Sequence, residues 1–595
     1  MSGGVLGALT DRARKRPWAI LGGHLAVLAI LAWVALAGPG ELTVGSLRLE
    51  DPGEVADLVV ATRSDQPTSS RFYETSLDVV ESGISTDPAV ESVRRGPEFG
   101  RETVTYLAVE LNTDDSGEQH EAVERIRDQI DAGALRIFIG GETPTLIEAR
   151  ETVIDDLWRL ELLAVPVIAL TLLLLLGACV AAVATLAAAT GIVGALALIR
   201  VIGVVGDVSL LGIAPAGIVS LALAAELAPR IAEGGGGPPG EPRHGWHDAP
   251  TRLAVLAAAA ALAAALGWVP TLLDQGASLA MAVGVAAALT ALGALIATPA
   301  VLALGGSART GIEAARSPRR QPTGGGSRLN ALREVPARIA ASGWLAALVA
   351  LAAIATTIFL AVPSVDGETR PLSSSDLRAD SEPRRAESLV AGLAGKDPRQ
   401  AGGKAGVRDE KRSKEAKAAD GLSPLGIDAG PGDSLYPELP LAATVSALLL
   451  ALLFGAVTRS LRSLVPAALA LLPAAAACGL GVLAFQNGDG AGLLGFREQD
   501  ALETGALAAA ACALAAVGAA RSMIGVVATP GAGVAPVSLR GALAGTVVAG
   551  IAAGVLVGVD LYSVREFGLL VAAGLVIDLV AIRIAVAPAL SCWRG

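Results

Sequence analysis

Long apolar runs constrain this chain more than any other feature of its sequence. An α-helix needs about 20 apolar residues to cross the hydrocarbon core of a bilayer. The runs of about that length lie near 17–37, 159–177, 179–199, 208–228, 251–271, 277–304, 342–362, 440–457, 463–485, 500–520, 541–560 and 567–590. The sequence therefore predicts a polytopic α-helical membrane protein with about 12 transmembrane helices.

Composition supports this fold class and excludes others. Of the 595 residues, 53% are hydrophobic and 17% are charged, whereas soluble domains have about 25% charged residues. A net charge of -11 without a basic face argues against a nucleic-acid partner. The cysteines lie in or beside apolar runs, so we interpret them as small buried hydrophobes and not as disulfides or metal ligands. They are Cys179, Cys478, Cys512 and Cys592.

The order of the runs predicts an internal repeat. Each half of the chain has one span, then a long hydrophilic segment, then five closely spaced spans. Because six spans separate equivalent elements, the halves form a 6+6 parallel pseudo-repeat about the membrane normal. The predicted regions are 1–37 (N-terminus and span 1), 38–157 (hydrophilic), 158–304 (spans 2–6), 305–341 (Arg-rich linker), 342–362 (span 7), 363–439 (hydrophilic) and 440–595 (spans 8–12).

Arginine and lysine residues predict the orientation. Basic residues cluster within 12–16, 309–338 and 459–462, which fall on one side of the membrane in a twelve-span topology. The positive-inside rule makes that side cytoplasmic. We therefore expect cytoplasmic termini, two extracytoplasmic hydrophilic segments, and a signal anchor at 17–37 in a plasma-membrane protein.

The two hydrophilic segments differ in character. In 38–157, strand patterns at 56–61, 90–94, 103–111 and 135–140 alternate with helical patterns at 71–82 and 117–130. This β-α-β-β-α-β order predicts one extracytoplasmic, ferredoxin-like α+β subdomain with an acidic surface. In 363–439, a helix is expected over 382–393. Most of the remainder, including the lysine-rich stretch 396–417, is expected to be a flexible, charged linker.

Several motifs, in their order and spacing, resemble the MMPL (mycobacterial membrane protein large) family of the RND transporter superfamily. The resemblance covers nearly the whole chain and is sharper in the second half. The motifs are Asp51-Pro-Gly-Glu, Gly140-Gly-Glu-Thr, the stretch 155–166, Asp207-Val-Ser-Leu, the hairpin 453–462, Phe485-Gln-Asn-Gly, Leu494-Gly-Phe, Val564-Arg-Glu-Phe-Gly and the stretch from 575 through Asp578 and Arg583 to 590.

The resemblance implies a proton-driven exporter of lipids or other hydrophobic compounds, with the α+β subdomain as a porter domain. In that family, the proton relay is an Asp-Tyr pair in span 4 and another in span 10. Here the corresponding slots hold Ala222-Leu223 and Ala520-Arg521, and neither span contains an Asp-Tyr pair. The resemblance therefore implies a divergent member, in which residues other than an Asp-Tyr pair would couple protons.

Four ionisable residues are candidates for proton coupling: Asp578, Glu226, Arg583 and Arg521. Ionisable groups within a membrane span usually face the protein interior and often have a functional role. Glu226 is either a displaced proton carrier or an ordinary partner of Arg230 at i,i+4 spacing. Asp578 is either a coupling residue or half of a structural ion pair with Arg521 or Arg583.

Other polar residues have simpler interpretations. Glu503 and Asp500 are expected to be solvated or to cap a helix, and His24 to be hydrogen-bonded to a neighbouring helix. The imidazoles of His244 and His247 lack the cysteines or carboxylates of a metal site. No phosphate loop or nucleophile elbow occurs, so neither an enzyme, a cofactor nor a metal is predicted.

Two functional hypotheses follow. The first is an MMPL/RND-like transporter of lipid or another hydrophobic compound, whose partners are membrane lipids and an unidentified hydrophobic substrate. The second is a transport-inactive homologue that acts as a scaffold or regulator in a cell-envelope complex. This alternative rests on the missing relay and on the shrunken second hydrophilic segment. It requires envelope-protein partners or a homo-oligomer.

Overall fold

The fold is described from a computed structural model of the chain. The described residues are 12, 15–37, 57–96, 103–113, 116–130, 133, 135–202, 212–234, 248–268, 273–304, 343–367, 369–370, 372–394, 438–460, 464–488, 501–527, 539–587 and 589. The predictions for the linker 305–341, the stretch 396–417, and Asp207, His244, His247, Asp500 and Cys592 lie outside them.

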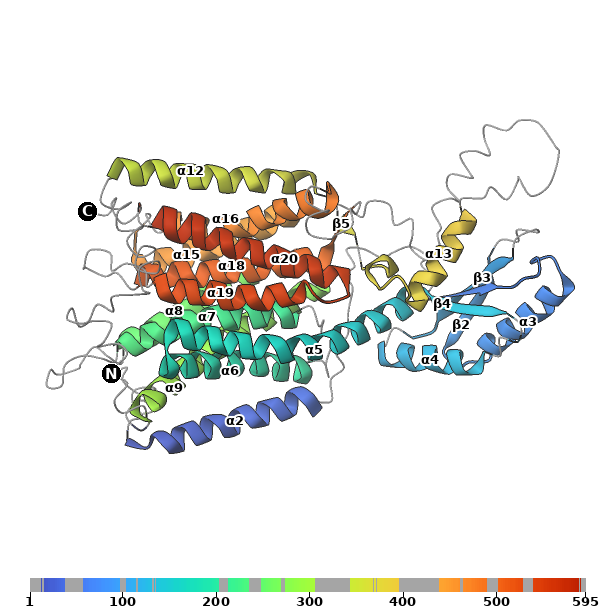
Figure 1. Cartoon of the computed structure of the whole chain (residues 1–595), viewed down its shortest axis with the longest axis horizontal. Helices are drawn as coiled ribbons and strands as arrows, with labels where there is room; N and C mark the ends of the chain where they lie inside the picture. The colour runs from blue at the N-terminus through green and yellow to red at the C-terminus, as the bar shows by residue number, and fades with distance from the viewer. Residues whose placement is uncertain are drawn as a thin grey trace.

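A bundle of long apolar helices makes up most of the molecule (Figure 1). Its helices are α2 (Pro17–Ala37), α5 (Glu142–Leu176), α6 (Ala178–Ile202), α7 (Ile213–Gly234), α8 (Asp248–Leu266), α9 (Leu273–Leu304), α12 (Gly343–Ala361), α15 (Glu438–Thr458), α16 (Leu464–Gly481), α18 (Thr504–Val527), α19 (Leu539–Leu556) and α20 (Tyr562–Ile577). The π-helices η5 (Val482–Gln486) and η6 (Asp578–Val586) extend α16 and α20.

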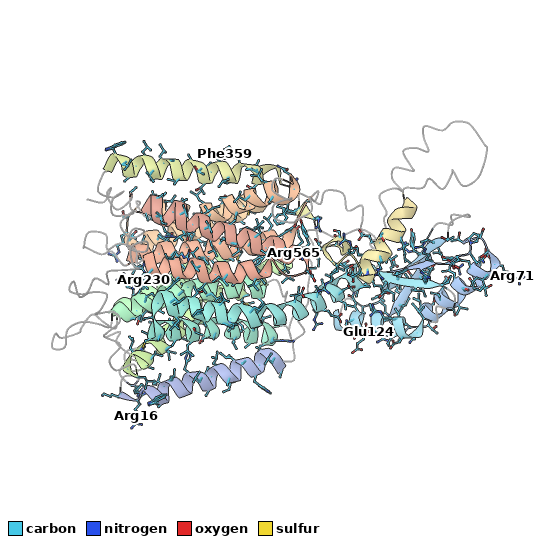
Figure 2. All side chains as sticks on the ribbon, viewed as in Figure 1. Arg16, Arg71, Glu124, Arg230, Phe359 and Arg565 are labelled. Carbon is cyan, nitrogen blue, oxygen red and sulfur yellow. The ribbon has the colours of Figure 1, made fainter. Side chains whose placement is uncertain are left out.

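The protein is a multi-pass helical membrane protein. Within the described ranges, nine helices are long and apolar enough to cross a membrane. Three further expected spans coincide with shorter apolar helices at Leu163–Leu176, Thr251–Leu266 and Arg540–Leu556. Exposed apolar side chains cover the outside of the bundle, as at Leu36 (79% exposed) and Phe359 (75%) (Figure 2). Such surfaces suit contact with lipid acyl chains.

Helix packing in the two halves follows the same pattern. In the first half α6 packs against α7 and α9, and α9 also packs against α7 and α8. In the second half α16 packs against α18 and α20, and α20 also packs against α18 and α19. The outer helices α2 and α12 lie on opposite sides of the bundle, where α2 contacts α6 and α12 contacts α16 (Figure 1).

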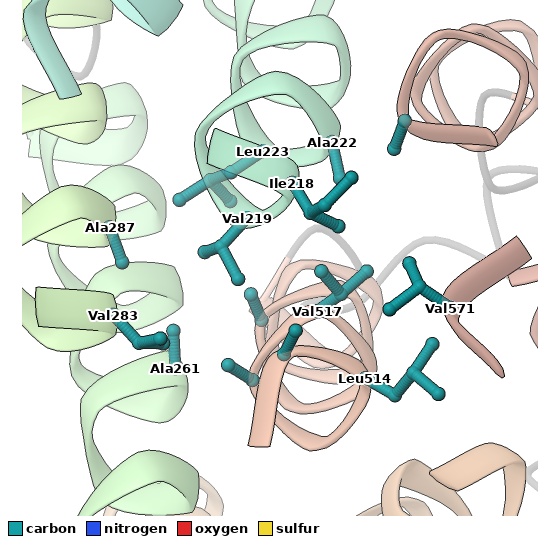
Figure 3. Packing of buried hydrophobic residues seen from close by; sticks show 14 of the residues in the cluster. Ile218, Val219, Ala222, Leu223, Ala261, Val283, Ala287, Leu514, Val517 and Val571 are labelled. Atoms are coloured by element: carbon teal, nitrogen blue, oxygen red, sulfur yellow. The ribbon is translucent and has the colours of Figure 1, made fainter. Parts of the chain in front are cut away.

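The two halves meet through α7 and α18, the most buried spans among those described. Their contacts also follow the repeat, since α7 packs against α19 and α18 packs against α8. Side chains at this interface are small or β-branched: Val219 and Ala222 of α7 lie near Val517 of α18 (Figure 3). Small residues let helix backbones approach closely. A Cβ on Gly545 of α19, for example, would lie 2.8 Å from the carbonyl oxygen of Ala222 of α7.

A four-stranded antiparallel sheet forms a separate layer at one end of the bundle (Figure 1). Its elements are β1 (Leu58–Arg63), α3 (Arg71–Ser85), β2 (Val90–Arg95), β3 (Val104–Leu111), α4 (Ser116–Gln129) and β4 (Arg136–Gly140). This is the β-α-β-β-α-β order expected from the sequence. The strand order is β2-β3-β1-β4, with register pairs such as Val60↔Leu107 and Val60↔Ile139.

One face of the sheet packs on α3 and α4. Leu58, Val60 and Leu107 point into this core together with Tyr73 and Ile126. Tyr73 keeps its hydroxyl paired by donating to the carbonyl oxygen of Thr62 at 2.9 Å. The first five residues of β1 are all buried, and because successive side chains of a strand point to opposite faces, both faces of β1 are covered.

The opposite face of the sheet is covered by a helix from the second hydrophilic segment. This helix, α13 (Glu382–Ala394), matches the helix expected over 382–393. Its Ala386 and Val390 pack on Val59 and Ala61 of β1. Glu382 fixes its start, because the carboxylate accepts the backbone N–H of Ile139 at 3.0 Å. The second segment therefore contributes to the first domain, a partner that the sequence analysis did not foresee.

The sheet domain joins the bundle through one continuous helix. Helix α5 begins at Glu142 directly after β4 and runs for 35 residues to Leu176. The expected domain boundary at 157/158 thus lies inside this helix. Gly177, at φ +81, separates α5 from α6 and allows the tight hairpin expected between these spans.

Candidate functional site

A network of buried charges lies between α7, α18 and the end of α20. Arg521 of α18 is at its centre, with a side chain only 2% exposed. Its Nε donates to Glu226 Oε2 at 3.1 Å, and its Nη1 donates to Asp578 Oδ2 at 2.7 Å. One guanidinium therefore links a carboxylate of the first half to a carboxylate of the second half.

Asp578 is held by two guanidinium groups. In addition to Arg521, Arg583 donates from Nε to Asp578 Oδ1 at 3.2 Å. The remaining donors of Arg583 reach the carbonyl oxygen of Gly518 at 3.1 Å and Ser522 Oγ at 3.2 Å. All of these partners lie in the second half, so Asp578 and Arg583 form a self-contained unit there.

A π-helix brings Asp578 and Arg583 together. In an α-helix, residues five apart are about 140° apart around the axis and do not face each other. The segment η6 begins at Asp578 and runs to Val586. Its i→i+5 hydrogen bonding places residues five apart one above the other. Single π-turns of this kind are frequent at functional sites.

Glu226 is held less firmly than Asp578. Apart from Arg521, its charged neighbour is Arg230, one turn along α7, with Nη2 at 3.8 Å from Oε1. That distance allows an ion pair but not a hydrogen bond. Nε and Nη2 of Arg230 make no hydrogen bond to any described residue. The i,i+4 pair expected from the sequence thus exists, but it is the longer of the two contacts of Glu226.

Helix α19 packs closely over the network. A Cβ on Gly545 would lie 2.8 Å from the carbonyl oxygen of Ala222 and 2.9 Å from Nη2 of Arg521. Nη2 of Arg521 also faces the carbonyl oxygen of Ala542, at 3.4 Å. Glycine at 545 is therefore needed for Arg521 to fit between α7 and α19. The slots of the family relay, Ala222-Leu223 and Ala520-Arg521, border this same point.

The structure brings together all four candidate residues selected from the sequence. Glu226, Arg521, Asp578 and Arg583 form one continuous chain of ion pairs. Sequence analysis had paired Asp578 with Arg521 or Arg583, and both pairs are present. It missed the pair between Glu226 and Arg521, because residues 295 positions apart leave no local signal.

The structure also shows the contacts of His24 and Glu503, two further candidates from the sequence. His24 of α2 shares a hydrogen bond with Thr190 Oγ1 of α6 at 3.0 Å, as expected for a histidine that faces a neighbouring helix. Glu503 caps α18, since its carboxylate accepts the N–H groups of Gly505 and Ala506. It is 2% exposed, so the solvated alternative is wrong.

Neither a metal cluster nor a disulfide is found in the described part of the chain. No three His, Cys, Asp or Glu residues there are arranged to hold an ion. Cys179, Cys478 and Cys512 are free thiols.

No protein-family model matches this chain, and neither does any curated protein.

The four residues of the network are shielded from water and balanced in charge, with Glu226 and Asp578 negative and Arg521 and Arg583 positive. Each of these four side chains is at most 6% exposed. Outside these four, Arg230 adds a positive charge 3.8 Å from Glu226. In a medium of low dielectric constant, removing one charge from such a set leaves an uncompensated partner that is strongly disfavoured. Any gain or loss of a proton here must therefore change how the helices pack.

Proposed function

We propose that this protein is an MMPL/RND-like membrane transporter that moves lipid or another hydrophobic compound across the cytoplasmic membrane. The observation that carries the proposal is the ion pair between Glu226 and Arg521, which crosses the interface between two similarly packed halves. It lies at the point where the resembled family has its proton relay. Membrane ionisable groups at such a position are functional by default.

The proposed architecture has twelve spans in two six-helix halves. The equivalent packing of α6, α7, α8 and α9 and of α16, α18, α19 and α20 supports it. In this topology the sheet domain and α13 are extracytoplasmic and form one porter-like unit, and both termini are cytoplasmic. Rocking of one half against the other would open the path alternately to each side.

Proton binding at Glu226 is the proposed coupling step. Protonating Glu226 removes one ion pair of 3.1 Å and one of 3.8 Å. Protonating Asp578 would disrupt its shorter contact to Arg521 and its contact to Arg583 as well. Neutral Glu226 leaves the network with one excess positive charge. That form favours an arrangement in which a guanidinium reaches water, so the proton shifts the balance between two packings.

A specific observation also favours the alternative, a transport-inactive scaffold or regulator of an envelope complex. Asp578 and Arg583 satisfy each other within the second half, and Arg521 adds a contact to the first. A fully paired network can simply lock two halves in one arrangement. The two hypotheses differ in whether Glu226 releases Arg521.

Reconstitution in liposomes separates them. Vesicles holding a pH-sensitive dye and a fluorescent phospholipid analogue report proton flux and lipid movement under an imposed pH gradient. For a transporter, the wild type shows both signals, Glu226→Gln removes the gradient dependence, and Glu151→Gln, the same change on an exposed position of α5, retains it. A wild type without any gradient-dependent signal would refute proton-coupled transport and favour the scaffold.

A further inference from the structure

A second group of buried charges lies at the end of the bundle that faces the sheet domain. There the short strands β5 (Thr369–Arg370) and β6 (Leu502–Glu503) pair in parallel. β5 belongs to the segment between α12 and α15, and β6 leads directly into α18. The group therefore sits where the second hydrophilic segment contacts the membrane helices.

Three carboxylates share this location with one guanidinium. Arg370 binds Asp376 in a bidentate manner, with both contacts at 2.6 Å. Glu503 accepts the N–H of Gly505 at 2.8 Å and that of Ala506 at 2.6 Å. Within the described residues, the cation of this group thus forms its direct ion pair with Asp376, and Glu503 is stabilised by the first turn of α18.

Glu566 of α20 is the carboxylate that remains without compensation. Its side chain is fully buried. Oε2 accepts the backbone N–H of Glu503 at 2.9 Å. Oε1 is buried and makes no hydrogen bond to any residue that the structure describes. A buried carboxylate oxygen that lacks a donor strongly disfavours the ionised form.

Among the residues that the structure describes, no other countercharge lies near Glu566. The charged groups that act on it are Asp376, Arg370 and Glu503. On its own helix, Arg565 turns away, towards the carbonyl oxygen of Val559 and the carboxylate of Asp560. Of the described elements packed against α20, α16 and η5 carry no charged residue, and the single charges of α18 and α19 are Arg521 and Arg540, at the far end. The other titratable groups on α16 and α18 are the thiols of Cys478 and Cys512.

We propose that Glu566, together with Glu503, forms a second proton-binding site, separate from the network around Arg521. The proton resides on Glu566, and Glu503 is the neighbouring carboxylate that caps α18. The site goes beyond the proposed transport function, because it is built from other residues. About 18 Å of helix separates Glu566 from Asp578, twelve residues further along the chain.

The electrostatics of Glu503 agree with this assignment. Burial raises the pKa of Glu503 to about 7, although the N–H groups of Gly505 and Ala506 oppose the shift. The Glu566 carboxylate accepts the backbone N–H of Glu503, so the two residues are neighbours, and a negative charge on Glu503 disfavours ionisation of Glu566.

A metal cation fits the site less well than a proton. Both oxygens of Asp376 are occupied by Arg370, and both oxygens of Glu503 accept backbone N–H groups. Only Oε1 of Glu566 is free to ligate. Calcium and magnesium require about six oxygen ligands, so one free oxygen is insufficient.

Infrared difference spectroscopy of the purified full-length protein tests the site without any assay of transport. Protonated carboxyl groups give a C=O stretching band that is resolved from those of carboxylates. We expect a band that persists to a pH well above the range of an ordinary glutamate in the wild type, is lost in Glu566→Gln, and is unchanged in Glu151→Gln. In Glu503→Gln, the removal of the neighbouring charge should lower the midpoint of the band's titration by about one pH unit or more.

Three results would overturn the proposal. One is a band that survives in Glu566→Gln, and another is a midpoint unchanged in Glu503→Gln, which decides the matter should Glu566→Gln fail to fold. The third is a spectral change that follows sodium or calcium concentration at constant pH, which would indicate a cation site. A failure of lipid transport would leave all three readouts unaffected, so the two proposals are tested separately.

Discussion

The ion pair between Glu226 and Arg521 predicts a large, non-additive effect of mutation on stability. Replacing Arg521 with methionine keeps most of the side-chain volume but removes the only short contact of Glu226 and one of the two guanidinium partners of Asp578. Removing one member of a buried ion pair leaves a buried charge without a partner, which costs about 3–5 kcal/mol in the free energy of unfolding. We expect Arg521→Met to fall in that range.

Replacing the other member of the pair should cause a smaller loss of stability. Glu226→Gln leaves Arg521 bound to Asp578 at 2.7 Å, so the expected cost is about 1–3 kcal/mol. In the double variant no charge of this pair is left unpaired. Its loss of stability should therefore be smaller than the sum of the single losses by at least about 1 kcal/mol, as is typical of residues in one charged network.

Equilibrium unfolding of the detergent-solubilised protein measures these differences. A surface pair gives the control: Arg94 and Glu110 of the sheet domain form an ion pair with side chains 55% and 38% exposed. The same double-variant cycle there should give a coupling of about 0.2–1 kcal/mol. If the losses for Glu226 and Arg521 add to within about 0.5 kcal/mol, the two residues do not interact and the network around Arg521 is not the link between the halves.

Three further predictions concern other contacts. Gly545→Val should lower stability by about 1–3 kcal/mol, because its Cβ meets α7 and the central guanidinium, whereas Gly554→Val, on the same helix with no atom within 4 Å, should be close to neutral in thermal unfolding. Val390→Asp should place a charge against the sheet and detach α13, which hydrogen exchange would detect as lost protection of 382–394 with α3 and α4 unchanged. Arg125 lowers the pKa of Asp87 below 3.8 through its hydrogen bond. The stabilisation that ionised Asp87 gives the sheet domain is therefore complete above pH 3.8 and is lost as the pH falls through the pKa of Asp87 in the folded state. Asp87→Asn should consequently flatten the acid limb of the curve of domain stability against pH.

Periodicity was sufficient to predict much of the fold. Helical spans are easy to recognise in a sequence, because runs of about 20 consecutive apolar residues are typical of membrane-spanning helices. In the sheet domain, alternation located all four strands to within a few residues, as with 103–111 against the observed Val104–Leu111. These signals are local, since each depends only on residues within one element.

Long-range partners were not predictable in the same way. The helix over 382–393 was expected, but not its place on β1, because Ala386 and Val390 show only that one face is apolar. Similarly, the π-helix at Asp578 has no sequence signature that distinguishes it from α-helix. In an α-helix the two residues would lie about 140° apart around the axis, so the sequence offers the pair of Asp578 with Arg583 only as one of two alternatives.

The four candidate residues lie together for a physical reason that can be read from the sequence. A charge within a membrane span must find a partner, and the interior of a bundle is where partners can be. Glu226, Arg521, Asp578 and Arg583 are charged residues in spans that consist mostly of apolar and small residues. The sequence could therefore identify the set, while only the three-dimensional packing could show which members meet.

The arrangement of charges also determines where the two halves can separate. Asp578 and Arg583 belong to one helix, and Arg521 binds them within the same half. Of the short ion pairs in the network, the pair from Arg521 to Glu226 is thus the one that crosses the interface. Movement of the halves has to break this contact, and a proton on Glu226 removes its charge without disturbing the second half. Glu226→Gln mimics that protonated form. In a transporter it should shift the protein towards the open packing, whereas in a rigid scaffold it should lower stability and leave the packing of α7 against α18 unchanged.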